Sequence, residues 1–87
     1  MSKEMAALCL GLVLLASAAL ADDARDCIQD KDPDLAIHAC TTLITKDAGN
    51  PALYNRRGNA YRAKGNYDEA IADHTRAVDL DPQSAVA

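Results

Sequence analysis

Residues 33–44 read PDLAIHACTTLI, and residues 67–78 read YDEAIADHTRAV. The two stretches align without a gap, each residue matching the one numbered 34 higher, and Asp, Ala, Ile and Thr recur at four of the positions. The apolar positions also keep their phase, since Leu43 and Ile44 match Ala77 and Val78. A fixed period of this length is typical of stacked supersecondary units, in which each copy buries one face against its neighbour.

Cap residues divide the second period into two helices. Asn50 before Pro51 predicts a helix start, and the chain then continues without a breaker to Lys64. Gly65-Asn66 predicts its end, because both residue types tolerate the left-handed conformation of a helix C-terminus. A second helix is expected from about Tyr67 to Leu80, because Pro82 follows and the residue before a proline avoids helical geometry.

The first period has the same kinds of helix start and end signals. Asp32-Pro33 opens its second helix and Ala48-Gly49-Asn50 closes it, while its first helix, Asp22 to Lys31, is short. We expect Asp81 to Ala87 to form a loose tail. The sequence therefore predicts an all-α fold, with two antiparallel helix-turn-helix hairpins stacked as a short α-solenoid.

Within residues 51–82, six residues fall at the spacing of a known repeat: Tyr54, Gly58, Tyr61, Ala70, Ala77 and Pro82. Together with residues 59–71, which read NAYRAKGNYDEAI, they make this segment resemble the tetratricopeptide repeat. Small residues at 58 and 70 suit the close approach of two helices, and the tyrosines fill the space above and below. Two residues depart from the family pattern: Arg57 stands where it usually has Leu, and His74 where it usually has a bulky residue.

The resemblance also implies a pairing of Cys27 with Cys40. One period later these positions become Tyr61 and His74, which face each other across the hairpin in the family. In an oxidising compartment the pair would form a disulfide, worth roughly 3 kcal/mol in the chain-entropy model. The alternative is two small buried apolar residues.

Catalysis and cofactors are not expected. Cys27, His38 and Cys40 could be drawn as zinc ligands, but His38 and Cys40 are two residues apart on one helix and so point away from one another. A redox enzyme would use an exposed C-x-x-C pair, which the sequence lacks. We interpret His74 as a packing residue against Tyr61, because no nucleophile accompanies it.

The first 21 residues predict a cleaved signal peptide. No residue from Met5 to Ala21 is charged, residues 8–15 read LCLGLVLL, and Ala19-Leu20-Ala21 offers a small-x-small cleavage site. Cys9 would be removed with it. The alternative is an uncleaved membrane anchor, although the apolar stretch is short for one. Cleavage would make the protein secreted or periplasmic, with no stable membrane span.

Composition limits the core and the partners. Hydrophobic residues make up 49% of the 87 positions, yet more than a third of them lie in the first 21, and the chain has no Trp or Phe. The core must therefore be thin. The formal net charge of −4 argues against nucleic acid as a partner.

The family resemblance implies a non-catalytic module that binds a peptide or protein segment in a concave groove. It would place three polar residues on that groove, namely Asn55, Asn59 and Arg62. Asparagine and arginine side chains can bind a peptide backbone or a carboxylate. The alternative is an ordinary solvated face, because polar helix surfaces are usually just wet.

A second reading makes the chain a structural unit. Ile71, Val78 and Leu80 lie on the last helix, where a following repeat would pack, and three repeats are generally needed for a stable stack. We therefore expect a homodimer through these residues, or else a terminal part of a longer repeat array. The expected divisions are a signal peptide (1–21), a degenerate first hairpin (22–49), a complete repeat (50–82) and a tail (83–87).

Overall fold

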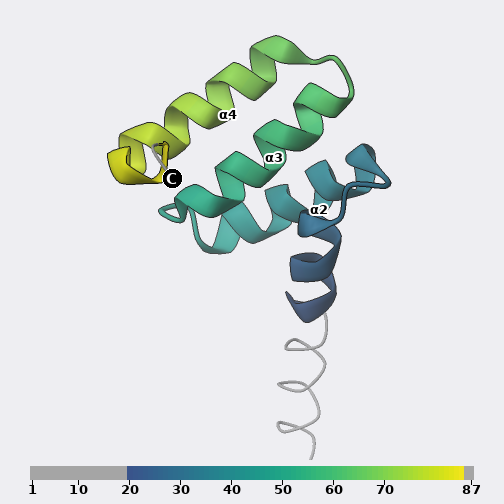
Figure 1. Ribbon diagram of the computed structural model, residues 1–87. Helices are drawn as coiled ribbons and strands as arrows, with labels where there is room; N and C mark the ends of the chain where they lie inside the picture. The colour runs from purple at the N-terminus through teal and green to yellow at the C-terminus, as the bar shows by residue number, and fades with distance from the viewer. Residues whose placement is uncertain (1–19, 86–87) are drawn as a thin grey trace, which may run out of the picture.

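The computed structural model describes residues 20–85, which form four helices packed as stacked helical hairpins (Figure 1). Residues 20–28 are helical and are followed by α2 (Pro33–Lys46), α3 (Pro51–Ala63) and α4 (Tyr67–Leu80). Helix α3 lies between α2 and α4, and the segment 20–28 adjoins α2 at the far side from α4. The all-α class and the stack of hairpins are thus confirmed. The predicted signal peptide lies outside the described residues, apart from its last two positions.

The helices begin where the sequence predicts. The side chain of Asp32 accepts a hydrogen bond from the Leu35 N–H (3.2 Å), and that of Asn50 accepts one from the Ala52 N–H (3.1 Å). Proline occupies the first position of both helices, where its missing N–H has no intrahelical partner. The signals that set these starts thus lie within a few residues of each helix.

The helix ends differ in detail from the prediction. Gly65 alone adopts a left-handed conformation, with φ of 84°, while Asn66 stays at φ of −85°. The Asn66 N–H then donates to the Tyr61 carbonyl (2.9 Å), which closes the end of α3. Helix α2 ends at Lys46 without a left-handed glycine, because the Asp47 N–H donates hydrogen bonds to the carbonyls of Leu43 and Ile44.

Both chain termini of the described region also differ. The first helix is already formed at Leu20 and stops at Ile28, three residues before the predicted end at Lys31. The predicted loose tail is partly ordered, since Pro82–Ala85 form a short 3-10 helix, η1, against the end of α4. Within η1, the Gln83 N–H donates to the Asp81 carboxylate (3.1 Å).

The core is thin, as the composition predicts. The buried apolar residues of the described region are mostly small: Cys27, Ala36, Ala39, Cys40, Tyr54, Ala60, Ala70 and Ala77. Cys27, Ala39 and Cys40 form one cluster, on which Leu43 of α2 and Leu53 of α3 pack. Small side chains let the helices approach closely, so the backbones themselves supply much of the packing surface.

Gly58 marks the closest approach of α3 to α4. A Cβ at this position would lie 2.9 Å from Nε2 of His74 and 3.2 Å from the carbonyl oxygen of Ala70. Only glycine fits without displacing a neighbour. Nearby, the Tyr54 hydroxyl donates to the Ala48 carbonyl (2.9 Å) and ties α3 to the loop before it.

Candidate protein-binding groove

A groove runs between the segment 20–28 and α3. It consists of two adjoining clefts of about 160 and 360 Å³ that share Cys27, Ile28 and Arg56. The first cleft is also lined by Gln29, Asp30, Pro33, Asn59, Ala60 and Ala63, and the second by Ala24, Arg25, Leu43, Asn50, Ala52 and Leu53. The groove wall, as we call residues 20–28, thus faces the first helix of the second repeat.

The α3 side of the groove carries a stripe of four residues, Ala52, Arg56, Asn59 and Ala63. Their spacing of four, three and four places them on one helix face, and all four are exposed. Arg56 stands in both clefts, and Ile28 lies across from it with 57% of its surface exposed. Within residues 20–85 the Arg56 guanidinium has no ion-pair partner. The groove therefore combines apolar surface with several polar side chains, among them the Arg56 guanidinium and the Asn59 amide.

The three predicted binding residues are not together in this groove. Asn59 lines the first cleft. Asn55 lies on the side of α3 that faces α4, where its Oδ1 is 3.1 Å from Nδ1 of His74. Arg62 is exposed and lines neither cleft.

Arg56 is the groove residue that the sequence analysis missed. The signal was present, because Ala52 and Ala63 mark a helix face on which Arg56 and Asn59 are the polar members. The predicted stripe of residues 55, 59 and 62 is rotated toward α4 by less than one residue step.

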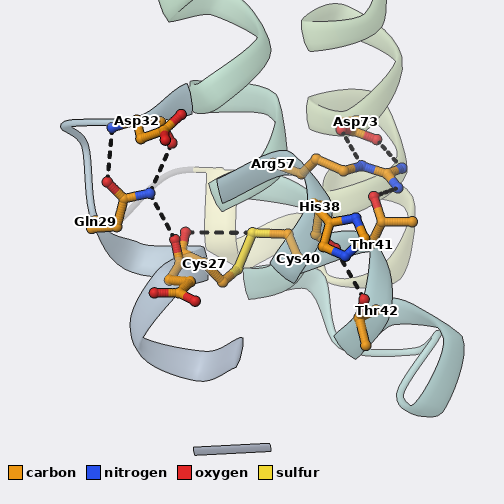
Figure 2. The surroundings of a disulfide bond; sticks show 10 residues. Cys27, Gln29, Asp32, His38, Cys40, Thr41, Thr42, Arg57 and Asp73 are labelled. Carbon is orange, nitrogen blue, oxygen red and sulfur yellow. Dashed lines mark hydrogen bonds and ion pairs between the residues drawn. A yellow bond between two sulfur atoms is a disulfide. The ribbon is translucent and has the colours of Figure 1, made fainter. Parts of the chain in front are cut away.

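Arg57, the departure from the family pattern, fixes the other side of α3. Its Nε and Nη2 donate to the two oxygens of Asp73 on α4, at 2.8 and 2.7 Å, and its Nη1 donates to Thr41 of α2 at 3.2 Å (Figure 2). The hydrogen bond with Asp73 raises the pKa of Arg57 above its ordinary value. The guanidinium also lies 5.7 and 6.0 Å from the ring centres of Tyr54 and Tyr61. One side chain thus joins three helices and holds α3 in place beside the groove.

His74, the second departure, packs against Gly58 and Asn55. The Nε2 edge of the ring faces Gly58, which has no side chain to displace it, and Nδ1 lies 3.1 Å from the Asn55 amide oxygen. Its position on the α3–α4 contact agrees with a packing role rather than a catalytic one.

A disulfide joins the groove wall to α2. Cys27 and Cys40 are bonded, their Cα atoms are 4.8 Å apart, and both are buried, at 3% and 0% exposure (Figure 2). Cys27 therefore forms the floor of both clefts and at the same time part of the core.

Gln29 shapes the loop between the groove wall and α2. Its Nε2 donates to the carbonyls of Asp26 (3.0 Å) and Asp32 (2.8 Å), and its Oε1 accepts from the N–H groups of Lys31 (3.0 Å) and Asp32 (2.9 Å). These four bonds use backbone groups that a longer helix would have needed, which explains the early end of the first helix. They also fix where α2 begins relative to the wall (Figure 2).

Two other kinds of site are absent from residues 20–85. No three His, Cys, Asp or Glu side chains of this region gather where they could hold a metal ion. None of its helices is long and apolar enough to cross a membrane.

Comparison with known proteins identifies the repeat. Residues 51–84 match the tetratricopeptide repeat family. The match supports the resemblance of this segment to that family, whose members are in general protein-interaction modules without catalytic activity. No solved structure matches the chain at a significant level.

The similar curated proteins are much longer than this chain. It is 37% identical over 71 residues to the Protein SGT1 homolog of Oryza sativa subsp. japonica, covering 78% of this chain and 19% of that protein. It is 30% identical over 83 residues to the Protein SGT1 homolog of Bos taurus, covering 95% and 24%. Identity to the RNA polymerase II-associated protein 3 of Xenopus tropicalis is 46% over 43 residues, covering 49% and 6%. The chain thus spans about a quarter or less of these relatives.

Proposed function

We propose that this protein is a non-catalytic interaction module that holds an extended segment of another protein in the groove between residues 20–28 and α3. The observation that carries the proposal is the placement of Arg56 and Asn59. Both are exposed, both line the groove, and apolar side chains flank them on either side. The family match supports the same class of function.

The chemistry of the groove fits a peptide. A guanidinium donates to a carboxylate or to backbone carbonyls, and an asparagine amide both donates and accepts, so the pair can bind a main chain in a fixed register. Ile28 and Ala63 offer apolar surface on either side for an aliphatic side chain. An open groove of this kind accommodates an extended chain rather than a small enclosed ligand.

Selection from a library of random peptides displayed on phage, with the oxidised full chain as bait, tests the proposal. Selected peptides should bind Arg56→Ala and Asn59→Ala at least about tenfold more weakly, a loss of about 1.4 kcal/mol. Arg76→Ala is the matched control, because Arg76 is an exposed arginine of α4 that lines neither cleft. Peptides that bind all three variants as tightly as the wild type would show that this face is only solvated surface.

The residues predicted from sequence are tested in the same assay. Asn55→Ala should act only indirectly, through the contact with His74, and Arg62→Ala should leave affinity unchanged. A large loss with Arg62→Ala would move the binding face toward the stripe of residues 55, 59 and 62.

We also propose that the protein is exported, to a secreted or periplasmic location. The uncharged run from Met5 to Ala21 supports the proposal, and so does the buried disulfide, because such bonds persist in oxidising compartments. Mass spectrometry of the chain from the exported fraction should find an N-terminus at Asp22. A chain that retains Met1 in that fraction would favour the membrane anchor instead.

Self-association is a second candidate, favoured by one observation on α4. Ile71 and Val78 are 64% and 39% exposed, whereas Ile37 and Ile44, at the same positions one period earlier, are half-buried on α2, the helix on which α3 packs. Leu80 is half-buried at the end of the helix. Helix α2 is thus covered by the α-helix that follows it. Within residues 20–85, no α-helix follows α4 to cover the corresponding face.

A second copy meeting α4 with its own α4 is the occupant that we propose. A head-to-tail stack would instead present the groove wall, which carries Asp23 and Asp26 where α3 has Arg57 and Ala60. Carboxylates against an apolar face would lose hydration without a partner. Sedimentation equilibrium should find a dimer that Ile71→Lys dissociates, with the exposed Ala72→Lys as control; a monomer at micromolar concentration would contradict the proposal.

A further inference from the structure

One residue makes the buried contact between the groove wall and the rest of the fold, while Gln29 holds only the C-terminal end of the wall. Among residues 20–28 the only buried side chain is that of Cys27, while Leu20 and Ile28 are 37% and 57% exposed. Burial of apolar surface therefore contributes little to the docking of this helix. Its one ion pair, between Arg25 and Asp22, lies within the helix itself and does not reach α2 or α3.

The second repeat shows what the first one lacks. Between α3 and α4 the contact is held by the Arg57–Asp73 pair, by Gly58 against His74 and by Asn55 at the same histidine. One period earlier, the positions of Arg57 and Asp73 are occupied by Asp23 and Ala39, which cannot form an ion pair. Cys27 and Cys40 occupy the positions of Tyr61 and His74, so the disulfide takes the place of side-chain packing.

We infer that the oxidation state of Cys27 and Cys40 decides whether residues 20–28 form the wall of the groove, which makes the groove a redox-conditional binding site. Reduction would break the S–S bond and leave two thiols, with two electrons and two protons supplied by two molecules of a thiol such as glutathione, which are joined as their own disulfide. The Gln29 bonds contain no sulfur and act only at the C-terminal end of the wall and in the loop, so the released helix would pivot about residues 29–32.

Burial of the sulfurs couples this reaction to binding. Both cysteines are shielded from solvent, so a reductant thiolate reaches them only when the wall opens. A peptide that bridges the wall and α3 stabilises the closed form and must therefore slow reduction, and by linkage oxidation must strengthen binding. This coupling rests on the proposed function, whereas the opening of the wall does not.

Hydrogen exchange measured by mass spectrometry tests the opening without any ligand. The full chain carries Cys9→Ala in all arms, so that no third thiol interferes, and is compared oxidised, reduced with dithiothreitol, and as Cys27→Ala/Cys40→Ala. Protection of the amides of residues 24–28 should fall at least about tenfold in the last two, while those of α3 and α4 keep theirs. Unchanged protection at 24–28 would overturn the inference, and so would equal loss in every helix, because the disulfide would then stabilise the whole fold rather than the wall.

The binding arm uses a peptide obtained from the phage selection. Its affinity should be at least about tenfold lower for the reduced chain, and a saturating amount of it should slow dithiothreitol reduction by a similar factor. Equal affinity for both forms would overturn the redox control while leaving the groove function intact. If no peptide binds either form but the amides of 24–28 still lose protection, the redox control of the wall is supported and the proposed function fails.

Discussion

Arg57 meets Asp73 through two hydrogen bonds of 2.8 and 2.7 Å, and the pair spans from α3 to α4 across the second repeat. Its side chains are only 19% and 7% exposed, so neither charge is well hydrated. Arg57 stands where a tetratricopeptide repeat usually has leucine, and Asp73 provides the compensating charge. Removing one partner leaves the other buried and unpaired.

This relationship predicts a strongly non-additive pair of substitutions. Arg57→Leu should lower the free energy of unfolding by roughly 3 kcal/mol, because the Asp73 carboxylate loses its partner. Asp73→Ala in the same chain should restore most of the loss, since alanine already occupies the matching position 39. Urea denaturation followed by circular dichroism measures Arg57→Leu, Asp73→Ala and the double variant. Simple addition of the two single effects would contradict a direct coupling.

Gly58→Ala should destabilise the protein although alanine favours helix. The new Cβ would lie 2.9 Å from His74 Nε2 and 3.2 Å from the Ala70 carbonyl, and overpacking of this kind costs about 1 to 3 kcal/mol. Gly49→Ala is the control, because no atom lies within 4 Å of its added Cβ, and it should be neutral or stabilising by up to about 1 kcal/mol. Thermal melts of both variants decide whether space or helix propensity dominates at position 58.

Gly65→Ala tests the end of α3. Its φ of 84° lies in the left-handed region, where a side chain costs about 1 kcal/mol or more. No neighbouring atom crowds the site, so the cost should come from the backbone alone. Gly65→Asn should therefore recover part of the stability in the same melting experiment, because asparagine tolerates this conformation better. Equal stability of the alanine and asparagine variants would argue against backbone conformation as the cause.

Gln29→Ala should loosen the connection between the groove wall and α2. Four hydrogen bonds to backbone groups of the loop would be lost. The free energy of unfolding should fall by only about 1 to 2 kcal/mol, because most of these groups can form hydrogen bonds with water instead. Gln83→Ala, at an exposed glutamine of η1, is the matched control. Amide exchange of residues 29–32 should accelerate in the first variant only. Unaltered exchange there would mean that the capped start of α2 fixes the loop without help from Gln29.

Much of the fold follows from the sequence because its signals are local. The 34-residue period, the Asp32-Pro33 and Asn50-Pro51 helix starts and the small residues at 58 and 70 each act within a few positions or within one hairpin. The groove residues were harder to predict. The face of α3 that meets the groove depends on how far the helix is rotated, and a rotation of less than one residue step exchanges Asn55 and Arg62 for Arg56.

Contacts between side chains far apart in sequence could not be derived from the pattern. Arg57 and Asp73 are 16 residues apart, and each alone is a typical exposed residue of a helix. The same holds for Asn55 and His74, 19 residues apart. Their pairing depends on the crossing of α3 and α4, which composition and periodicity leave open.

The alanine-rich core limits how this protein can change over time. In a core of leucine and phenylalanine, one large side chain can often be replaced by another of similar volume. The buried alanines here have no smaller alternative except glycine, which weakens a helix: Ala36, Ala39, Ala70 and Ala77. Viable substitutions should therefore accumulate on the outer faces and in the groove, where new partners are acquired, while these interior positions stay nearly fixed. Such a chain can diversify in what it binds far more readily than in how it folds.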